Sequence, residues 1–449
     1  MRILAGARHV AIWGFGREGR ATFDFLRENH PDIDLAILND TPLGQPPDAS
    51  VIQGDAAAAA IRSGRFDVVV KSPGISLYRP EIADAKAAGT RFTSATNLWF
   101  EQNPQAKTIA VTGTKGKSTT ARLLQCILQK AGLDVALMGN VGTAALGHAP
   151  GRDYTVMELS SYQIADLDYA PDIAVITNLF PEHAPWHGGA EQYFRDKLRI
   201  LNIGAKTRAV CNHANARLRE RVAARADIVW FNRADGFCAR DGGLFFDGAP
   251  VDCNGFPLKG EHNLGNLAAA CAVADLAGVP AVRRAVDLRD FKQLDHRLQE
   301  FRAGNILCVN DSIATVPQAT TAALGAYPDR DTILLLGGAE RGQDFGELFA
   351  LLPQTRVRAV ILLPPIGERV FAQMSGQPLS FALLRAANLK DAVEQAFRRV
   401  SANGLILLSP GAPSFGEFRD FEERGRSFRA TCEECAGRIE ASDCGTRNA

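Results

Sequence analysis

The sequence lacks a surplus of charge of either sign, because its 449 residues contain 50 Lys+Arg and 50 Asp+Glu. A chain without a basic excess does not favour nucleic acid or an anionic membrane surface as its partner. We therefore expect any anionic ligand to be bound by a local site rather than by the overall field of the protein.

Long hydrophobic runs are also missing. No apolar stretch approaches the roughly 20 residues that a membrane-spanning helix needs. The first residues, "MRILAGARHVAIWGFG", lack the pattern of a secretory signal peptide and run directly into a strand-like segment. We predict a cytoplasmic protein with no membrane and no nucleic-acid partner.

The nine cysteines form no framework, because their number is odd and they are scattered along the chain. This distribution is typical of reduced thiols buried as small hydrophobic side chains. Cys432 and Cys435 form a single CxxC. Without a second pair, we interpret it as helical spacing rather than as a metal or redox site.

What the chain does have is a regular alternation of short apolar segments with helical stretches. The apolar segments, such as "HVAIWGFG", "TIAVTG" and "TILLLGG", end in Gly, Asn, Asp or Pro, which are turn residues. This alternation predicts parallel sheets with helices on their faces. The length suggests about three such α/β units in series.

A glycine-rich turn follows the first apolar segment. Gly14, Gly16 and Gly19 match G-x-G-x-x-G between a strand and a helix, where a helix start can hold a pyrophosphate. Asp40 lies about 20 positions further on and could bind a ribose. The alternative is a tight turn without a ligand. We favour ligand binding, without assuming that the ligand is NAD.

A second turn, "VTGTKGKSTT" at residues 111–120, resembles a phosphate-binding loop whose first glycine is replaced by Val111. It still brings two glycines, two lysines and several hydroxyl groups to the start of a helix. Unpaired N–H groups and the positive end of the helix dipole favour phosphate there. We predict a nucleotide site rather than a structural turn.

Three further segments are ambiguous when each is taken alone. Glu158 ends an apolar strand and is either an Mg²⁺ ligand or an exposed strand-end side chain. His183 and His187 share a loop and suggest zinc, but no further ligand completes a set. Asn263 and Asn266 lie three apart on one helical face and either read an adenine or cap the helix.

As an ordered set, the segments resemble the Mur ligases, the ATP-dependent amino-acid-adding enzymes of peptidoglycan synthesis, and within them the enzymes that add glutamate. The resemblance rests on "TGTKGKST", "ELSSYQ", "TNLFPEH", "DKLRI", "GEHNLGN", "DHR", "NDSIAT" and "LLLGG". It covers nearly the whole chain. It implies three domains: a Rossmann-like UDP-binding domain (1–104), a central P-loop ATPase-like domain with a mostly parallel sheet (105–299), and a Rossmann-like amino-acid-binding domain (300–449).

The resemblance also implies site residues and cofactors. The UDP substrate would lie on Gly14, Phe15, Gly16, Arg17, Asp40, Thr41, Ser72, Gly74, Asn140 and Ser160. ATP would lie on Gly113, Thr114, Lys115, Gly116, Lys117, Ser118, Thr119, Asn263, Asn266, Arg297 and Asp311. Two Mg²⁺ ions would be held by Ser118, Glu158, His183 and a carbamylated Lys197. Glutamate would lie on Thr315, Arg341, Ser414 and Phe421.

The implied reaction runs through an acyl phosphate, with Lys117, Glu158, His183 and Lys197 as catalytic residues. The alanyl carboxylate of UDP-N-acetylmuramoyl-L-alanine would attack the γ-phosphate of ATP, and the amine of glutamate would then displace phosphate. Two Mg²⁺ ions and Lys117 would neutralise the anions that must meet. A monomer is expected.

Two departures from the family pattern concern the incoming amino acid. Glutamate-adding members commonly have lysine where this chain has Ile313 and where it has Arg341. Because a changed set of cations around a chiral dicarboxylate can change its stereochemistry, we favour L-glutamate over D-glutamate. The D-glutamate enzyme, a folylpolyglutamate-synthase-like ligase and a nicotinamide-dependent dehydrogenase remain as alternatives.

Overall fold

The computed structural model describes residues 2–43, 48–140, 143–292, 295–340, 343–376 and 378–446. Arg341, one of the predicted glutamate contacts, therefore lies outside the described residues. The chain forms two compact units, Met1–Phe291 and Lys292–Ala449, called here the N-terminal and the C-terminal unit. Both are built from mostly parallel sheets with helices, so the predicted α/β class is confirmed. The division at 104/105 and 299/300 stays a prediction.

The first sheet of the N-terminal unit is fully parallel, in the order β3-β2-β1-β4-β5. Its strands are β1 (His9–Trp13), β2 (Asp34–Asn39), β3 (Ser50–Gln53), β4 (Val68–Lys71) and β5 (Arg91–Thr93). Its helices are α1 (Arg17–Asn29), α2 (Asp55–Arg62), α3 (Pro80–Ala87) and α4 (Ala95–Gln102).

Alternate side chains of β1 enter different cores because successive residues of a strand point to opposite faces. Val10 and Ile12 pack in one cluster, whereas Ala11 and Trp13 pack in another. The strand order changes direction between β1 and β4. Ligands of open parallel sheets bind at such a point, beyond the carboxyl ends of the strands.

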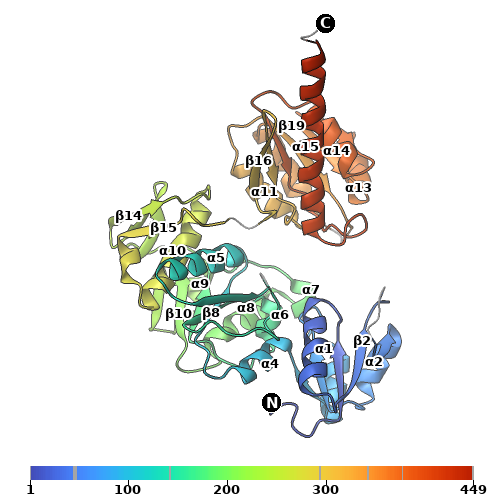
Figure 1. The fold of residues 1–449 in the computed structure, drawn as a ribbon, viewed down its shortest axis with the longest axis vertical. Helices are drawn as coiled ribbons and strands as arrows, with labels where there is room; N and C mark the ends of the chain where they lie inside the picture. The colour runs from blue at the N-terminus through green and yellow to red at the C-terminus, as the bar shows by residue number, and fades with distance from the viewer. Residues whose placement is uncertain are drawn as a thin grey trace. The chain divides into compact units, whose positions relative to one another are not determined.

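A second parallel sheet has the order β11-β10-β9-β6-β8-β7. Its strands are β6 (Thr108–Thr112), β7 (Val135–Gly139), β8 (Tyr154–Glu158), β9 (Ile173–Ile176), β10 (Arg208–Asn212) and β11 (Ile228–Phe231). Helices α5 (Lys117–Lys130) and α10 (Glu261–Leu276) lie side by side (Figure 1) and share one core with Ile109 and Val111.

The opposite face of this sheet shares a core with the first sheet. Ala110 of β6 belongs to the same cluster as Val10, Leu26 and Trp99. Helices on this side are α6 (Ser161–Ala165), α7 (Ala184–His187) and α8 (Ala190–Leu198), followed by η1 (Arg199–Leu201). One continuous apolar cluster therefore joins the two sheets within the N-terminal unit.

A small mixed sheet completes the N-terminal unit. It contains β12 (Phe237–Arg240), β13 (Gly243–Phe246), β14 (Ala249–Asn254) and β15 (Ala285–Asp287), with α9 (Ala216–Arg221) and η2 (Pro280–Arg283) nearby in the chain. Within the described residues, no helix is both long enough and apolar enough to cross a membrane.

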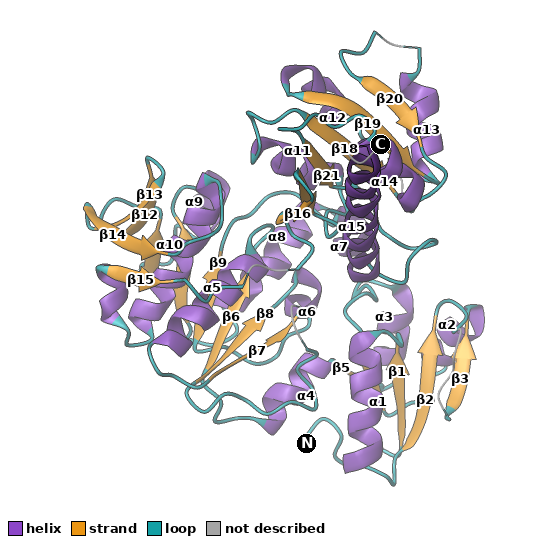
Figure 2. Cartoon of the chain, turned by 45° about the horizontal axis from the view of Figure 1, so that its top comes forward, coloured by secondary structure: helices purple, strands orange, loops and turns teal. Residues whose placement is uncertain are grey.

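The C-terminal unit contains one six-stranded sheet in the order β16-β17-β21-β18-β19-β20 (Figure 2). Only the β16–β17 pair is antiparallel among its described pairs. Its strands are β16 (Gln299–Ala303), β17 (Ile306–Asn310), β18 (Thr332–Gly337), β19 (Val357–Leu363), β20 (Ala382–Arg385) and β21 (Leu405–Leu408). Its helices are α11 (Pro317–Gly325), α12 (Gly346–Leu351), η3 (Leu352–Gln354), α13 (Ile366–Met374), α14 (Leu389–Phe397) and α15 (Phe421–Thr446).

Cys432 and Cys435 lie on α15 and are free thiols buried in the core of this unit. Burial raises the pKa of both thiols, which disfavours the thiolate that metal binding and redox chemistry require. The interpretation of the CxxC as helical spacing agrees with this position.

An ion pair at the end of β4 ties the first sheet to the segment after α6. The Nζ of Lys71, which is 1% exposed, lies 3.0 Å from Asp166 Oδ2 and donates to the Ile75 carbonyl oxygen at 3.0 Å. Burial raises the pKa of Asp166, although Lys71 opposes that shift. Without Lys71, this carboxyl group would be buried without its cation.

We expect Lys71→Met to lower the free energy of unfolding of the N-terminal unit by about 3 kcal/mol, because it leaves Asp166 unpaired. Tryptophan fluorescence during urea unfolding measures this, since all four tryptophans (13, 99, 186 and 230) lie in that unit. The control is Lys130→Met, whose more exposed partners Asp287 and Asp290 should make its loss cost much less. Equal losses of unfolding free energy in the two variants would show that the Lys71 ion pair contributes no more than an exposed pair.

Candidate functional site

The glycine-rich turn after β1 is braced by the turn after β4. Ser72 Oγ donates to the Gly14 carbonyl oxygen at 2.6 Å, and the Phe15 N–H donates to Asn39 Oδ1 at 3.1 Å. Gly16 is the N-cap of α1 and supplies no side-chain cap, so it does not satisfy the N–H groups of the first turn. This is the arrangement that the pattern predicted for an anion-binding turn.

Two charged residues near this turn already have protein partners. Asp40 accepts from Trp13 Nε1 at 3.1 Å and from Arg79 at 2.5 Å. Arg17 donates to the carbonyl oxygens of Gly139 and Asn140, both at 3.1 Å, and so reaches from α1 to the end of β7. Arg17 thus connects the first sheet to the second.

The second predicted loop begins at Gly113, as the shortened pattern required, because Val111 is a buried residue inside β6. Gly113 has φ +145° and Gly116 has φ +84°, in the region that favours glycine. A Cβ atom would overlap Thr177 Oγ1 at the first position and Asn266 Oδ1 at the second. Packing therefore requires both glycines.

Side chains from the loop after β9 hold this turn in place. Asn178 Oδ1 accepts from the Lys115 N–H at 2.8 Å, and Glu182 Oε1 lies 2.6 Å from Lys115 Nζ. Thr114 Oγ1 lies 2.8 Å from the hydroxyl of Tyr193 on α8. Lys117 Nζ donates to the Gly113 and Thr114 carbonyl oxygens at 3.0 and 2.9 Å.

The two predicted adenine contacts form a chain on α10. Asn266 Oδ1 lies 3.3 Å from Thr120 Oγ1, and Asn266 Nδ2 donates to Asn263 Oδ1 at 3.2 Å. Asn263 Nδ2 donates to the Lys259 carbonyl oxygen at 2.7 Å. Asn266 therefore supports the loop at Gly116, and a contact of either residue with adenine stays a prediction.

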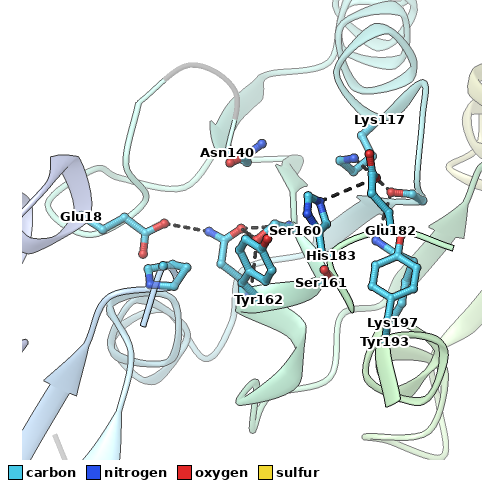
Figure 3. Close-up of a pocket in the computed structure, with 14 residues that line it drawn as sticks. Glu18, Lys117, Asn140, Ser160, Ser161, Tyr162, Glu182, His183, Tyr193 and Lys197 are labelled. Atoms are coloured by element: carbon cyan, nitrogen blue, oxygen red, sulfur yellow. Dashed lines mark hydrogen bonds and ion pairs between the residues drawn. The ribbon is translucent and has the colours of Figure 1, made fainter. Parts of the chain in front are cut away.

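A cavity of about 340 Å³ lies between these turns (Figure 3). Predicted residues that line it are Gly74, Gly113, Lys117, Asn140, Ser160, His183 and Lys197. Residues that line it and were not predicted are Glu18, Pro73, Ser161, Tyr162, Gln163, Glu182 and Tyr193. The structure thus brings residues of both turns and of the loop after β9 to one site.

Several predicted residues of the N-terminal unit are described but do not line this cavity. They are Gly14, Phe15, Gly16, Arg17, Asp40, Thr41, Ser72, Thr114, Lys115, Gly116, Ser118, Thr119, Glu158, Asn263 and Asn266. Phe15 is instead a core residue, whereas Ser118 lies in the first turn of α5 and Glu158 ends β8. Their ligand contacts stay predictions.

Lys197 is almost fully buried, with 1% of its side chain exposed. Its Nζ donates to the Gly113 carbonyl oxygen at 3.0 Å and lies over the Tyr193 ring, 5.2 Å from the centroid. Burial lowers the pKa of Lys197 well below its ordinary value, and the positive charge of Lys117 adds to that effect. The cavity therefore holds an amine that loses its proton easily.

Glu158 is fully buried at the end of β8. Its Oε1 accepts from Asn140 Nδ2 at 2.8 Å, while its Oε2 is buried and has no hydrogen-bond partner. A buried carboxylate oxygen without a partner is costly unless a ligand or cation completes it. This observation fits a cation next to Glu158.

The described residues contain no group of three or more His, Cys, Asp and Glu side chains placed to hold a metal. His183 lines the cavity, and burial lowers its pKa. His187 does not line it: its Nδ1 lies 2.6 Å from Asp196 Oδ2 and its Nε2 lies 3.0 Å from Ser161 Oγ. The zinc interpretation therefore has no support from the described residues.

Asp196 is the centre of a buried hydrogen-bond network. Tyr78 donates its O–H to the carboxylate at 2.7 Å, and Gln192 Nε2 donates at 2.7 Å. His187 Nδ1 must also donate, since an ionised carboxylate only accepts, so its Nε2 accepts from the Ser161 hydroxyl when the ring is neutral. The network joins the turn after β4 to α6 and α8.

Most of the cavity-lining residues that were not predicted lie inside motifs that had been recognised in the sequence. Glu18 is part of "GFGREG", and Ser161 to Gln163 are part of "ELSSYQI". Their roles depend on which residues fold against them, because Gln163 Nε2 donates to Glu18 Oε1 at 2.8 Å across 145 residues of sequence. No local pattern reveals such a pair.

In the C-terminal unit, the segment after β17 contains the predicted residue Asp311 and contacts the first turn of α15, which contains the predicted residue Phe421. Asp311 accepts from Ser409 Oγ at 2.8 Å, and burial raises its pKa to about 7. Ser312 Oγ donates to the Phe421 carbonyl oxygen at 2.7 Å. Arg424, which was not predicted, is buried and donates to Ser312 Oγ at 3.0 Å and to the Ala412 carbonyl oxygen at 3.1 Å.

The other predicted residues of this unit lie in segments next to its strands and helices. Ser414 is buried, Thr315 is partly exposed between β17 and α11, and Arg297 precedes β16. Ile313 N–H donates to the His296 carbonyl oxygen at 3.1 Å. Contacts of these residues with ATP or glutamate stay predictions.

Comparison with known proteins gives the class of this protein. The model of the Mur ligase middle domain matches residues 111–274. A UDP-N-acetylmuramoyl-L-alanine–L-glutamate ligase of Xanthomonas euvesicatoria is 39% identical over 441 residues, which cover 93% of this chain and 94% of that protein. A ligase of the same name from Salinispora tropica is 37% identical over 96% of this chain and 98% of its own.

A solved structure shows the same fold. A MurF ligase from Thermotoga maritima in complex with ADP matches with a TM-score of 0.59 at 17% identity, over 97% of each chain. The chain belongs to the Mur ligase family. Members of this family are ATP-dependent ligases that form amide bonds in peptidoglycan synthesis, so the family and the enzyme class predicted from the sequence are confirmed, and the dehydrogenase alternative is set aside.

We expect Asp196→Asn to lower the free energy of unfolding of the N-terminal unit by about 2 kcal/mol, because an amide NH₂ would face groups that already donate. Tryptophan fluorescence in urea measures the loss. The control is Asp134→Asn at the exposed pair with Arg152, which should leave the free energy of unfolding nearly unchanged. An Asp196→Asn variant as stable as its control would show that the network does not support the fold.

Proposed function

We propose that this chain uses ATP to join L-glutamate to UDP-N-acetylmuramoyl-L-alanine. The observation that carries the proposal is the single cavity that Gly74 and Asn140 share with Lys117, His183 and Lys197. A substrate held by the turns of the first sheet would place its carboxylate beside a phosphate-binding loop there. The names of the two relatives described above support this substrate pair and the L-enantiomer.

Within this proposal, the residues act mainly by position and charge. The turn from Gly14 to Arg17 would bind the diphosphate, and the loop from Gly113 to Thr119 would bind ATP. Lys117 would stabilise the negative charge that develops as the alanyl carboxylate attacks the γ-phosphate. The glutamate amine would then displace phosphate from the acyl phosphate and form the amide.

We also propose that two Mg²⁺ ions bind at this site, through four side chains of this chain. Ser118, Glu158 and His183 would hold them together with Lys197 as a carbamate, and the unpartnered Glu158 Oε2 fits this role. Mg²⁺ binds few protein carboxylates and takes its other oxygen ligands from phosphates and water. The ions would supply charge neutralisation of the phosphates.

The carbamate on Lys197 has a physical basis in the burial of this side chain. The neutral amine attacks CO₂, a C–N bond forms, and one proton is released, which converts an ammonium into an oxygen anion. Burial and Lys117 lower the pKa of Lys197 well below its ordinary value, which favours the neutral amine that this reaction needs. The negative carbamate would also relieve the repulsion from Lys117.

The amino-acid site belongs to the C-terminal unit in this proposal. Thr315, Ser414 and Phe421 would contact glutamate, together with Arg341, and Arg297 and Asp311 would reach ATP. A cytoplasmic location and a monomeric state stay predictions.

We expect the protein to prefer L-glutamate over D-glutamate. Incubation with UDP-N-acetylmuramoyl-L-alanine, ATP and Mg²⁺ should give the amide product with L-glutamate, and at least about 10-fold less with D-glutamate, measured by product mass and released phosphate. A preference for D-glutamate would leave the ligase chemistry standing and overturn the enantiomer. No product with either enantiomer would overturn the proposed function.

We also expect Lys197 to carry a carbamate. Protein equilibrated with ¹³C-bicarbonate should show a carbamate carbonyl signal by NMR, because the buried amine is neutral enough to react. Lys197→Ala should abolish the signal, whereas Lys206→Ala, at an exposed lysine, should retain it. A carbamate signal that survives Lys197→Ala would place the carbamate on another residue. If the unmodified protein shows no carbamate signal, Lys197 is not a metal ligand.

A further inference from the structure

Glu18 is an acidic residue in a turn that is otherwise built to attract anions. It lies in the first turn of α1, and its Oε1 accepts from Gln163 Nε2 at 2.8 Å. Figure 3 shows Glu18 on one side of the cavity and Lys117 on the other, with Asn140 and Ser160 between them. Glu18 therefore lines the same cavity as the phosphate-binding loop, at its far end.

The second oxygen of Glu18 has no partner. Its Oε2 is buried and makes no hydrogen bond. Burial raises the pKa of Glu18 to about 7, despite the opposing charges of Arg17 and Lys71. Arg17 donates to backbone carbonyl oxygens, and Lys71 is paired with Asp166. The isolated protein thus holds a carboxyl group that is incompletely satisfied, and such groups are common at ligand sites.

The chemistry of a carboxylate decides which part of a substrate it can face. A carboxylate only accepts hydrogen bonds and is repelled by the oxygens of a diphosphate or of a second carboxylate. In the substrate proposed above, the groups between the diphosphate and the alanyl carboxylate include sugar hydroxyls and amide N–H groups, which donate. Glu18 directly follows the turn assigned to the diphosphate and lines the cavity that extends to Lys117, so donors between the diphosphate and the alanyl carboxylate would pass beside it.

We propose that the Glu18 carboxylate accepts a hydrogen bond from an N–H or O–H group of the N-acetylmuramoyl-L-alanine portion of the substrate, and so selects for that portion rather than for UDP. This inference rests on the proposed function and adds a residue to it. Gln163 would orient the carboxylate by holding one oxygen, which leaves the other to the ligand.

Glu18→Gln tests this directly, because it changes one oxygen only. The amide oxygen can still accept from Gln163, while the second oxygen becomes an NH₂ group that cannot accept. Calorimetry should show that the variant binds UDP-N-acetylmuramoyl-L-alanine about 10-fold or more weakly than the unmodified protein, whereas the Kd for UDP changes by less than about twofold. Glu18→Ala, which removes the carboxyl group, should show the same selective loss.

The matched control is Glu28→Gln, which makes the same change at an exposed position of the same helix and should bind both ligands normally. Equal weakening of both ligands by Glu18→Gln would mean that Glu18 only supports the turn. Tighter binding of both would mean that it repels the diphosphate, and no change would mean that it makes no contact. Each of these results overturns the proposal.

The proposed function can fail separately. If the unmodified protein binds neither UDP nor UDP-N-acetylmuramoyl-L-alanine, the substrate assignment is wrong, and the role of Glu18 is overturned with it. If the unmodified protein binds both and forms product, the comparison of the Glu18 variants tests Glu18 alone.

Discussion

The site depends on two lysine side chains beside one loop, of which Lys197 is buried and Lys117 is partly exposed. Lys117 and Lys197 both donate to the Gly113 carbonyl oxygen at 3.0 Å, so two amines converge on a single backbone oxygen. Like charges so close, one of them on the buried Lys197 side chain, disfavour each other. The repulsion is relieved when one amine loses its charge and when anions bind beside the other. A ligase with nucleotide and carboxylate substrates must bind such anions.

The rest of the N-terminal unit holds this loop and its cavity in shape. Thr177 and Asn266 close around the two glycines, and Tyr193 meets Thr114. Polar contacts that attach the first sheet include the ion pair of Lys71, the network centred on Asp196, the Glu18 to Gln163 hydrogen bond and the hydrogen bonds of Arg17 to the end of β7. On the side of the first sheet, the residues that make these contacts lie at the end of β4 or in the segments that follow β1 and β4, so the topology itself brings the two turns to one cavity.

Much of this could be predicted from local patterns. The alternation of apolar and turn segments predicted the parallel sheets, and "TGTKGKST" located the start of α5 and the loop before it. The ordered motifs predicted the family, and several of them, such as "TGTKGKST", "ELSSYQ" and "NDSIAT", begin at the end of a strand, where ligands of parallel sheets bind. The small sheet from β12 to β15 was not predicted, since its short strands carry weak patterns.

The contacts between distant segments could not be predicted in the same way. Glu18 and Gln163 are polar residues in motifs, and nothing local shows that they meet. His187 looked like a partner of His183 because the two share a loop, yet it faces Asp196 and Ser161. Arg424 lies in an ordinary helical pattern, and only the folded C-terminal unit shows that it is buried beside Ser312.

The central claim is that the cavity brings a substrate carboxylate to the γ-phosphate of ATP. The most direct measurement follows oxygen atoms. UDP-N-acetylmuramoyl-L-alanine labelled with ¹⁸O in the alanyl carboxylate is turned over with ATP and glutamate, and the released phosphate is analysed by mass spectrometry. If an acyl phosphate forms, each phosphate carries one ¹⁸O, because the bridging oxygen leaves with phosphorus. Unlabelled phosphate alongside amide product would contradict the account.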